Sequence, residues 1–164
     1  MHSPQLFARA ACALALVLFA GGAAAQAPVR PPYGAGINIE TAKKVAAAAI
    51  AEAKKNNWSD AIAIVDNHGM LIYYEMMDDT QTAAATVAIE KAKTSAGFRR
   101  ASKEFEDGVA GGRHALLGLP GVTPIEGGLP IMVSGKMVGA IGVSGMAGPQ
   151  DTVVAKAGVD ALAK

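Results

Sequence analysis

Two histidines and a row of basic side chains are the residues best suited to chemistry once the first 25 residues of the chain are set aside. His114 follows Gly111-Gly112-Arg113, where a flexible backbone lets a neutral imidazole swing to meet a metal ion. His68 stands in the turn sequence Asp66-Asn67-His68-Gly69, which turn chemistry alone explains. We therefore expect His68 to be an exposed loop residue. His114 is the candidate metal ligand, with a structural or solvated role as its alternative.

The basic row consists of Lys91, Lys93, Arg99 and Arg100 on one side of a predicted helix. We interpret them as one basic row on the side of the helix that does not carry the alanine stripe. Two interpretations fit it. The row is either a surface that binds an anion or a solvated face that pairs with nearby acids, namely Glu104, Glu106 and Asp107.

Known catalytic motifs are absent from the sequence. It has no Ser/His/Asp order, no HExxH, no P-loop and no GxGxxG after a strand. Asp78-Asp79 is better explained as the end of a strand before a helix than as an acid/base couple. Whether the chain is an enzyme stays open, and the candidates for a convergent acid/base set are Lys91, Lys93, Arg99, Glu126 and Asp151.

The N-terminus predicts a secretory signal peptide over residues 1–25. Arg9 gives a basic start, Ala10 to Ala20 is apolar, and Ala23-Ala24-Ala25 is an A-x-A-type cleavage site. The apolar stretch is too short for a comfortable membrane span, so we expect a soluble periplasmic or secreted protein with no membrane insertion after cleavage. The single cysteine, Cys12, lies in this leader, so cleavage removes the only thiol.

The charge balance argues against two classes of partner. Removing the leader takes away one basic side chain and no acid, which leaves 14 Lys plus Arg against 14 Asp plus Glu. A formally neutral chain shows no excess of basic side chains that would indicate binding to nucleic acid or an electrostatic membrane anchor. Low charge and strands that are apolar on both faces favour self-association, so we expect a homo-oligomer.

Three long helices and one short helix are predicted from hydrophobic spacing and capping signals. The first begins after an Asn38 N-cap, and the second is capped by Thr80 or Thr82 and ends near Ser102. Ser102 also starts the short helix through a Ser-x-x-Glu-like cap, and the last helix begins at Pro149. Ahead of them, residues 26–36 form a Pro- and Gly-rich arm, and residues 37–164 form one domain.

Two hairpins are predicted between the helices. Residues 62–77 turn at Asn67 to Gly69, and residues 125–145 turn at Ser134-Gly135-Lys136. Small residues in the second hairpin indicate that a helix backbone, a partner or a flat ligand approaches it closely. The chain is therefore predicted to be an α+β domain, an antiparallel sheet sandwiched by helices. In the last strand one face should carry Met137, Gly139, Ile141 and Val143, and the other Val138, Ala140, Gly142 and Ser144.

Several motifs, taken in order, resemble the GlcG/HbpS family. They span nearly the whole predicted domain, and the most specific is Val138 to Gly145 with Gln150-Asp151 downstream. The others are Ala63-Ile64-Val65-Asp66-x-x-Gly69, Lys91-Ala92-Lys93-Thr94-Ser95-x-x-Phe98-Arg99, Leu119-Pro120-Gly121 and Gly127-Gly128-x-Pro130-Ile131. The resemblance implies a profilin-like domain with about five antiparallel strands between helices, and it implies homo-oligomers.

The same resemblance suggests three roles. Some members of the family bind haem, one branch acts as an exported haem-responsive partner of a sensor kinase, and others are encoded with glycolate or corrinoid metabolism. The leading hypothesis is therefore an exported, oligomeric binding protein for haem or a related tetrapyrrole, with a sensor or operon-encoded protein as a further partner. The alternatives are a small-molecule enzyme or its accessory subunit, and a structural oligomer without a ligand.

If haem binds, its two propionates need cations on one side while the apolar ring lies on Gly and Ala. Lys93, Arg99 and Arg100 are the expected propionate partners. The iron ligand is not fixed across the family, so His114 is taken from its setting in this chain. The alternatives are Met146, a tyrosine and a hydroxyl such as that of Thr94.

Two positions depart from the family pattern. The family often has a small residue where this chain has Met146, and an uncharged residue where it has Glu126. A methionine at this position narrows a pocket beside the hairpin or supplies a thioether ligand.

Overall fold

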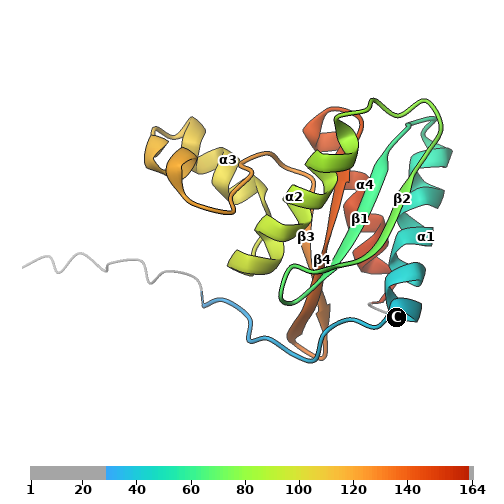
Figure 1. The fold of residues 1–164 in the computed structure, drawn as a ribbon, viewed down its shortest axis with the longest axis horizontal. Helices are drawn as coiled ribbons and strands as arrows, with labels where there is room; N and C mark the ends of the chain where they lie inside the picture. Colours follow the sequence, from blue (N-terminus) through green and yellow to red (C-terminus); the bar gives the residue numbers. More distant parts are fainter. Residues whose placement is uncertain (1–28, 163–164) are drawn as a thin grey trace, which may run out of the picture.

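A computed structural model describes residues 29–162 of the chain, so the predicted leader and Cys12 lie outside the described residues. The predicted α+β class and the order of helices and hairpins are confirmed (Figure 1). The elements are α1 (Ile39–Lys55), β1 (Ala61–Asp66), β2 (Leu71–Met76), α2 (Ala84–Phe98), α3 (Lys103–Ala110), the 3-10 helix η1 (His114–Gly118), β3 (Gly128–Val133), β4 (Lys136–Ser144) and α4 (Gly148–Asp160).

The sheet has four antiparallel strands within the described residues, in the order β2-β1-β4-β3. The expectation of about five strands is therefore not confirmed. The described part of the arm, from residue 29, adds no named strand to the sheet but forms an isolated parallel bridge with it, between Tyr33 and Met137. The two hairpins lie side by side because β1 pairs with β4 along its whole length, from Ala61 opposite Ser144 to Asp66 opposite Gly139.

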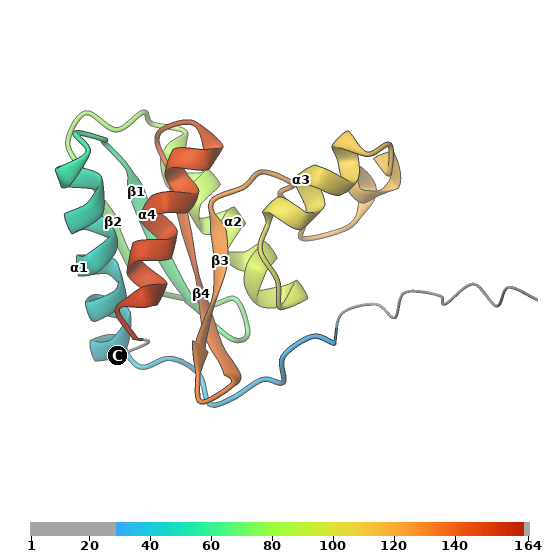
Figure 2. The ribbon, with the colours of Figure 1, turned by 180° about the vertical axis from the view of Figure 1, so that it is seen from behind.

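Helices cover both faces of the sheet, as predicted (Figures 1 and 2). On one face α1 and α4 bury Ile62 and Ile64 of β1 together with Ile141 of β4. On the other face the alanines of α2 pack against Ala63 and Val65. The small helix α3 and η1 extend to one side of this sandwich (Figure 1).

The small residues of β4 make room for the backbone of α2. A Cβ atom on Gly142 would clash with the carbonyl oxygen of Ala88 and with the backbone of Ala92. The close approach predicted for this hairpin is thus made by a helix. One detail of the predicted strand is wrong: Met137 packs with Ala140 on the α2 side, whereas Ile141 packs on the other side.

A β-bulge explains why Met137 faces the side of the sheet opposite to the one predicted. Ile131 of β3 pairs with Gly139 and the next residue, Met132, pairs with Met137, so Val138 is an extra residue on β4. An extra residue reverses the alternation of side chains beyond it. The predicted alternation therefore holds only from Gly139 onwards.

The helix ends are only partly as predicted. Asn38 caps α1 as expected, since its Oδ1 accepts from the Thr41 N–H at 2.8 Å. Neither predicted threonine caps α2, which begins at Ala84 after an Ala83 cap, and the Thr80 hydroxyl instead donates to the Met77 carbonyl at 2.8 Å. The helix also ends at Phe98 and not near Ser102, because Arg99 adopts a left-handed conformation with φ 54°.

Ser102 does not cap the short helix α3 with its side chain, contrary to the prediction. Its hydroxyl donates to the Ile125 carbonyl at 2.7 Å and accepts from the Gly128 N–H at 2.9 Å. Both partners lie just before or at the start of β3, so the side chain fastens α3 to the sheet. None of the described helices is both long and apolar enough to cross a membrane.

Candidate functional site

An open groove of about 390 Å³ lies between α2, the β1–β2 turn and the loop that follows η1. It brings together His68, Lys93, Phe98 and Pro120, with Gly69, Glu90, Gly97 and Gly121 completing the lining. An imidazole, an ammonium group and an aromatic ring therefore share one concave surface. Concave sites with a few convergent polar groups and an apolar lining are where small ligands bind.

The β1–β2 turn positions His68. Asp66 Oδ1 accepts from the backbone N–H groups of His68 and Met70, at 2.8 and 2.9 Å, and Gly69 has a positive φ of 82°. These bonds fix the backbone of the turn while leaving the imidazole exposed. The expectation of an exposed loop histidine is met, yet this residue lies in the same groove as Lys93.

Thr94 holds the opposite wall of the groove. Its buried hydroxyl donates to the Glu90 carbonyl at 2.9 Å and accepts from the Thr123 N–H at 2.9 Å, and the Gly121 carbonyl lies 3.3 Å away. These contacts fasten the loop that carries Pro120 and Gly121 onto α2. In this structure Thr94 therefore shapes the groove from behind and does not line it.

The four residues of the predicted basic row lie in four different surroundings. Lys93 is half exposed in the groove and pairs with Glu90 at 2.8 Å. Arg99 turns away from it: Nη1 donates to the Pro31 carbonyl at 3.2 Å and the guanidinium stacks over the Tyr33 ring. Of these two cations, only Lys93 lines the groove.

Arg100 faces α3. Its guanidinium lies 3.8 Å from the centre of the Phe105 ring and its Nη1 is 3.4 Å from Glu104 Oε2. The Phe105 ring in turn makes an edge-to-face contact with Phe98 of the groove, with centroids 5.0 Å apart. Arg100 thus supports the groove lining indirectly through two aromatic rings.

His114 and Met146 lie in other parts of the molecule. His114 is the exposed first residue of η1, and its backbone N–H donates to the Gly112 carbonyl at 2.9 Å. Met146 precedes α4, and its N–H donates to Asp151 Oδ1 at 3.0 Å. Neither residue lines the groove that holds Lys93. Among residues 29–162 there is no group of three or more His, Cys, Asp or Glu side chains that could hold a metal ion.

The prediction that the basic row is either solvated or anion-binding is wrong for Lys91, because this residue is fully buried. Its ammonium donates to Asp151 Oδ2 at 2.6 Å and to the Val143 carbonyl at 2.9 Å. Asp60 is also buried, and within the described part of the chain neither of its carboxylate oxygens has a hydrogen-bond partner. Burial, and then the negative charge of Asp151, raise the pKa of Asp60 to about 6.

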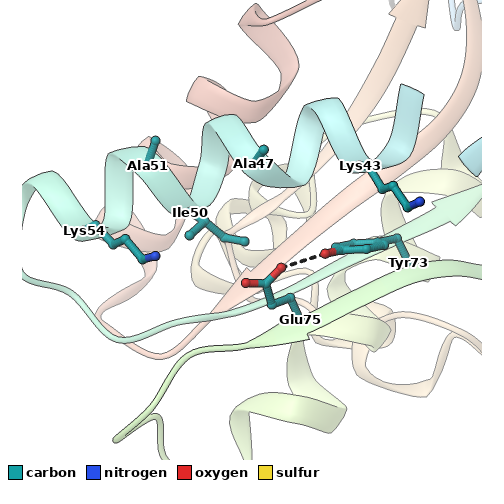
Figure 3. Close-up of a pocket in the computed structure, with 7 residues that line it drawn as sticks. All are labelled: Lys43, Ala47, Ile50, Ala51, Lys54, Tyr73 and Glu75. Carbon is teal, nitrogen blue, oxygen red and sulfur yellow. Dashed lines mark hydrogen bonds between the residues drawn. The ribbon is translucent and has the colours of Figure 1, made fainter. Parts of the chain in front are cut away.

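A second groove, of about 340 Å³, lies between α1 and the edge strand β2 (Figure 3). Its lining includes Ala47, Ile50 and Ala51 of α1, and the Tyr73 hydroxyl donates to Glu75 Oε2 at 2.6 Å. This hydrogen bond is the main reason why the pKa of Tyr73 is raised. No histidine lines this groove, so it offers lysines but no imidazole.

A family model described as haem degrading protein HbpS-like matches residues 37–160. The chain belongs to this HbpS-like family. Protein GlcG of Escherichia coli strain K12 is 46% identical over 108 residues, which are 66% of this chain and 81% of GlcG. The resemblance drawn from the sequence motifs is confirmed.

Two solved structures of this family's fold are informative. A double mutant of Streptomyces reticuli HbpS superposes with a TM-score of 0.73 at 28% identity, covering 84% of this chain and 98% of that chain. A PduOC:heme complex superposes with a TM-score of 0.70 at 24% identity, covering 77% and 94% of the two chains. The second shows that a protein of this fold binds haem.

Sequence reasoning overlooked His68 as a groove residue because its turn has a sufficient local explanation. The closeness of this turn to Lys93 depends on a contact across about 25 residues of sequence, which no local pattern encodes. The burial of Lys91 did have a signal. Lys91 is in phase with Ala84, Ala88 and Ser95, the small-residue face of α2 that packs on the sheet.

Proposed function

We propose that this protein is an exported binding protein for haem or a related tetrapyrrole, and that the groove beside α2 is its site. The observation that carries the proposal is the convergence of His68, Lys93 and Phe98 on one groove in a chain of the HbpS-like family. Neutral imidazole is a common iron ligand, an ammonium group pairs with a propionate, and an aromatic side chain packs against the macrocycle. Bound haem would supply a redox-active iron.

The groove is open to solvent, so one chain contacts only part of a flat ring. A second copy of the chain that covers the exposed side of the ring would complete the site, which supports the expectation of a homo-oligomer. The predicted leader supports export to the periplasm or beyond. A sensor or operon-encoded protein is the further partner that the family suggests.

The ligand itself is tested by titrating haemin into purified, tag-free protein that begins at Gln26. We expect a Soret band that shifts and saturates at a defined stoichiometry. Absorbance and mass spectrometry of the protein as isolated would show whether a tetrapyrrole copurifies. A titration with no saturable shift would exclude haem as the ligand.

The iron ligand is tested by two matched variants, His68→Ala and His114→Ala. The groove geometry favours His68, whereas the sequence prediction of His114 places the iron near η1. We expect His68→Ala to shift the Soret maximum or to weaken haemin binding by about tenfold, which is about 1.4 kcal/mol. If His114→Ala does this instead, the site lies near η1. If both variants match the wild type, Met146, a tyrosine, the Thr94 hydroxyl or no protein ligand remains.

The propionate partner is tested by Lys93→Glu and Arg100→Glu. Lys93 lines the groove, but the Arg100 guanidinium is engaged by Phe105 and Glu104. Charge reversal should therefore weaken haemin binding more at Lys93 than at Arg100, and both variants should stay folded because both side chains are at least partly exposed. Equal affinities for Lys93→Glu and the wild type would move the propionates elsewhere.

A further inference from the structure

Residues 30–36 of the N-terminal arm, which we call the strap, are hydrogen-bonded to two walls of the groove. These walls are the β1–β2 turn and the end of α2. The Asn67 side chain, next to His68 in the β1–β2 turn, donates to the Gly34 carbonyl at 2.6 Å. The Tyr33 hydroxyl donates to the Ala96 carbonyl at 2.9 Å, and the Gly97 carbonyl lies 3.2 Å away at the end of α2. Gly97 itself lines the groove.

Further contacts fix the strap along its length. Its backbone pairs with β4, since the Met137 N–H donates to the Pro32 carbonyl at 2.9 Å and the Gly34 N–H donates to the Met137 carbonyl at 2.8 Å. At its start Arg30 pairs with Glu104 of α3 at 3.0 Å. The segment Pro31-Pro32 has little conformational freedom to lose on docking.

Arg99 locks the strap to the end of α2. It ends the helix with φ 54°, a conformation that a side chain other than glycine seldom adopts. Its guanidinium donates to the Pro31 carbonyl and stacks over the Tyr33 ring, 5.0 Å from the ring centre. Arg99 therefore has two roles: it sets the backbone conformation directly after Phe98, which lines the groove, and it holds the strap.

We infer that the docked strap is the binding-competent state of the groove, with Tyr33 and Asn67 as its positioning residues. The strap spans from the turn that carries His68 to the helix end that carries Phe98, so it sets how far apart these two walls stand. If it detaches, the bond from Tyr33 to the Ala96 carbonyl and the bond from Asn67 to the Gly34 carbonyl are both lost. The inference rests on the proposed function and adds to it a coupling between the strap and the ligand.

The coupling can be measured with haemin and three variants of the protein that begins at Gln26. Tyr33→Phe removes only the hydroxyl bonded to α2, and Asn67→Ala removes the bond to Gly34. Because apparent affinity falls with the fraction of competent protein, we expect each to weaken haemin binding by about three- to tenfold. Tyr74→Phe is the matched control, since Tyr74 lies on the sheet outside the groove and no hydrogen bond of its hydroxyl occurs among the described residues; its affinity should be unchanged.

The effect of haemin on amide hydrogen exchange provides a second readout, because a merely structural role of the strap would not make its exchange depend on haemin. By linkage, a ligand that prefers the docked strap must stabilise it, so haemin should slow exchange of the Gly34 and Ile37 N–H groups, which bond to β4. The same amides should exchange faster in ligand-free Tyr33→Phe. Tyr33 is 43% exposed, so this variant is expected to fold.

The outcomes separate the two claims. Wild-type protein that binds haemin while strap exchange and the Tyr33→Phe affinity stay unchanged overturns the coupling and leaves the proposed function standing. Wild-type protein that binds no haemin overturns both. Weakened binding in Asn67→Ala alone also overturns the coupling, because it would reflect a local disturbance of the His68 turn.

Discussion

Replacing Asp60 by Asn should remove a pH-dependent loss of stability. Asp60 is fully buried, and its charge is opposed by burial and by the neighbouring carboxylate of Asp151 on α4, while Lys91 on α2 partly offsets them. The folded state therefore holds the Asp60 proton up to a pKa of about 6, compared with an ordinary value of 3.8. In Asp60→Asn the amide stays neutral at every pH.

The sign and the size follow from proton linkage. The folded state binds the proton more tightly than the unfolded state, so the contribution of Asp60 is fully present below pH 3.8 and is lost as the pH rises to about 6. A shift of about two pKa units corresponds to about 3 kcal/mol at 1.36 kcal/mol per unit. The unfolding free energy of Asp60→Asn minus that of the wild type should therefore increase by about 3 kcal/mol from pH 3.5 to pH 7.5.

Urea denaturation of both proteins at several pH values measures it. Taking the difference between the two proteins at each pH cancels the titration of the carboxylates that do not interact with Asp60, and leaves that of Asp60 together with its neighbour Asp151. We expect a difference that grows between pH 4 and about 6 and then stays constant. A difference that is the same at every pH would refute the reasoning, because Asp60 would then titrate alike in the folded and unfolded states.

Three further variants test individual contacts. Lys91→Met should destabilise the protein by about 3–5 kcal/mol at neutral pH in urea denaturation, because it leaves Asp151 buried without its cation; a neutral effect would mean that the ion pair is not buried in solution. Thr94→Val should cost about 1–3 kcal/mol, since it leaves the Thr123 N–H unpaired, and it should also weaken haemin binding, whereas a loss of stability with unchanged haemin affinity would separate this loop from the site. Gly142→Ala should lower stability by about 1–3 kcal/mol because its Cβ would strike the α2 backbone; calorimetry showing an unchanged melting temperature would contradict the close packing of α2 on β4.

Much of the fold could be predicted because its signals are local. The Asn38 cap, the two hairpin turns and the small residues of β4 each encode their structure within a few residues. The errors occurred where a side chain has a better partner far away in the sequence. Ser102 bonds to Ile125 and Gly128 in place of its own helix, and the bulge at Val138 depends on pairing with β3.

The candidate site was less predictable for the same reason. Lys93 was identified because it belongs to a visible basic row, but that row divides in space: Lys91 enters the core and Arg99 holds the strap. The spacing of residues along one helix predicts the direction in which each side chain points, but not which residues it contacts in the folded chain. The groove is formed by three segments that are distant in the sequence, so His68 and Lys93 become neighbours only in the folded chain.

The most direct test of the account is to locate the ligand on the protein by NMR. Ferric haemin broadens amide signals near the iron, and zinc protoporphyrin serves as the diamagnetic control. We predict selective broadening of the groove amides of Gly69, Gly97 and Gly121, with the signals of Ala47 and Glu75 in the α1–β2 groove retained. Broadening confined to Ala47 and Glu75, or to residues around His114, would contradict the assignment of the site to the groove beside α2.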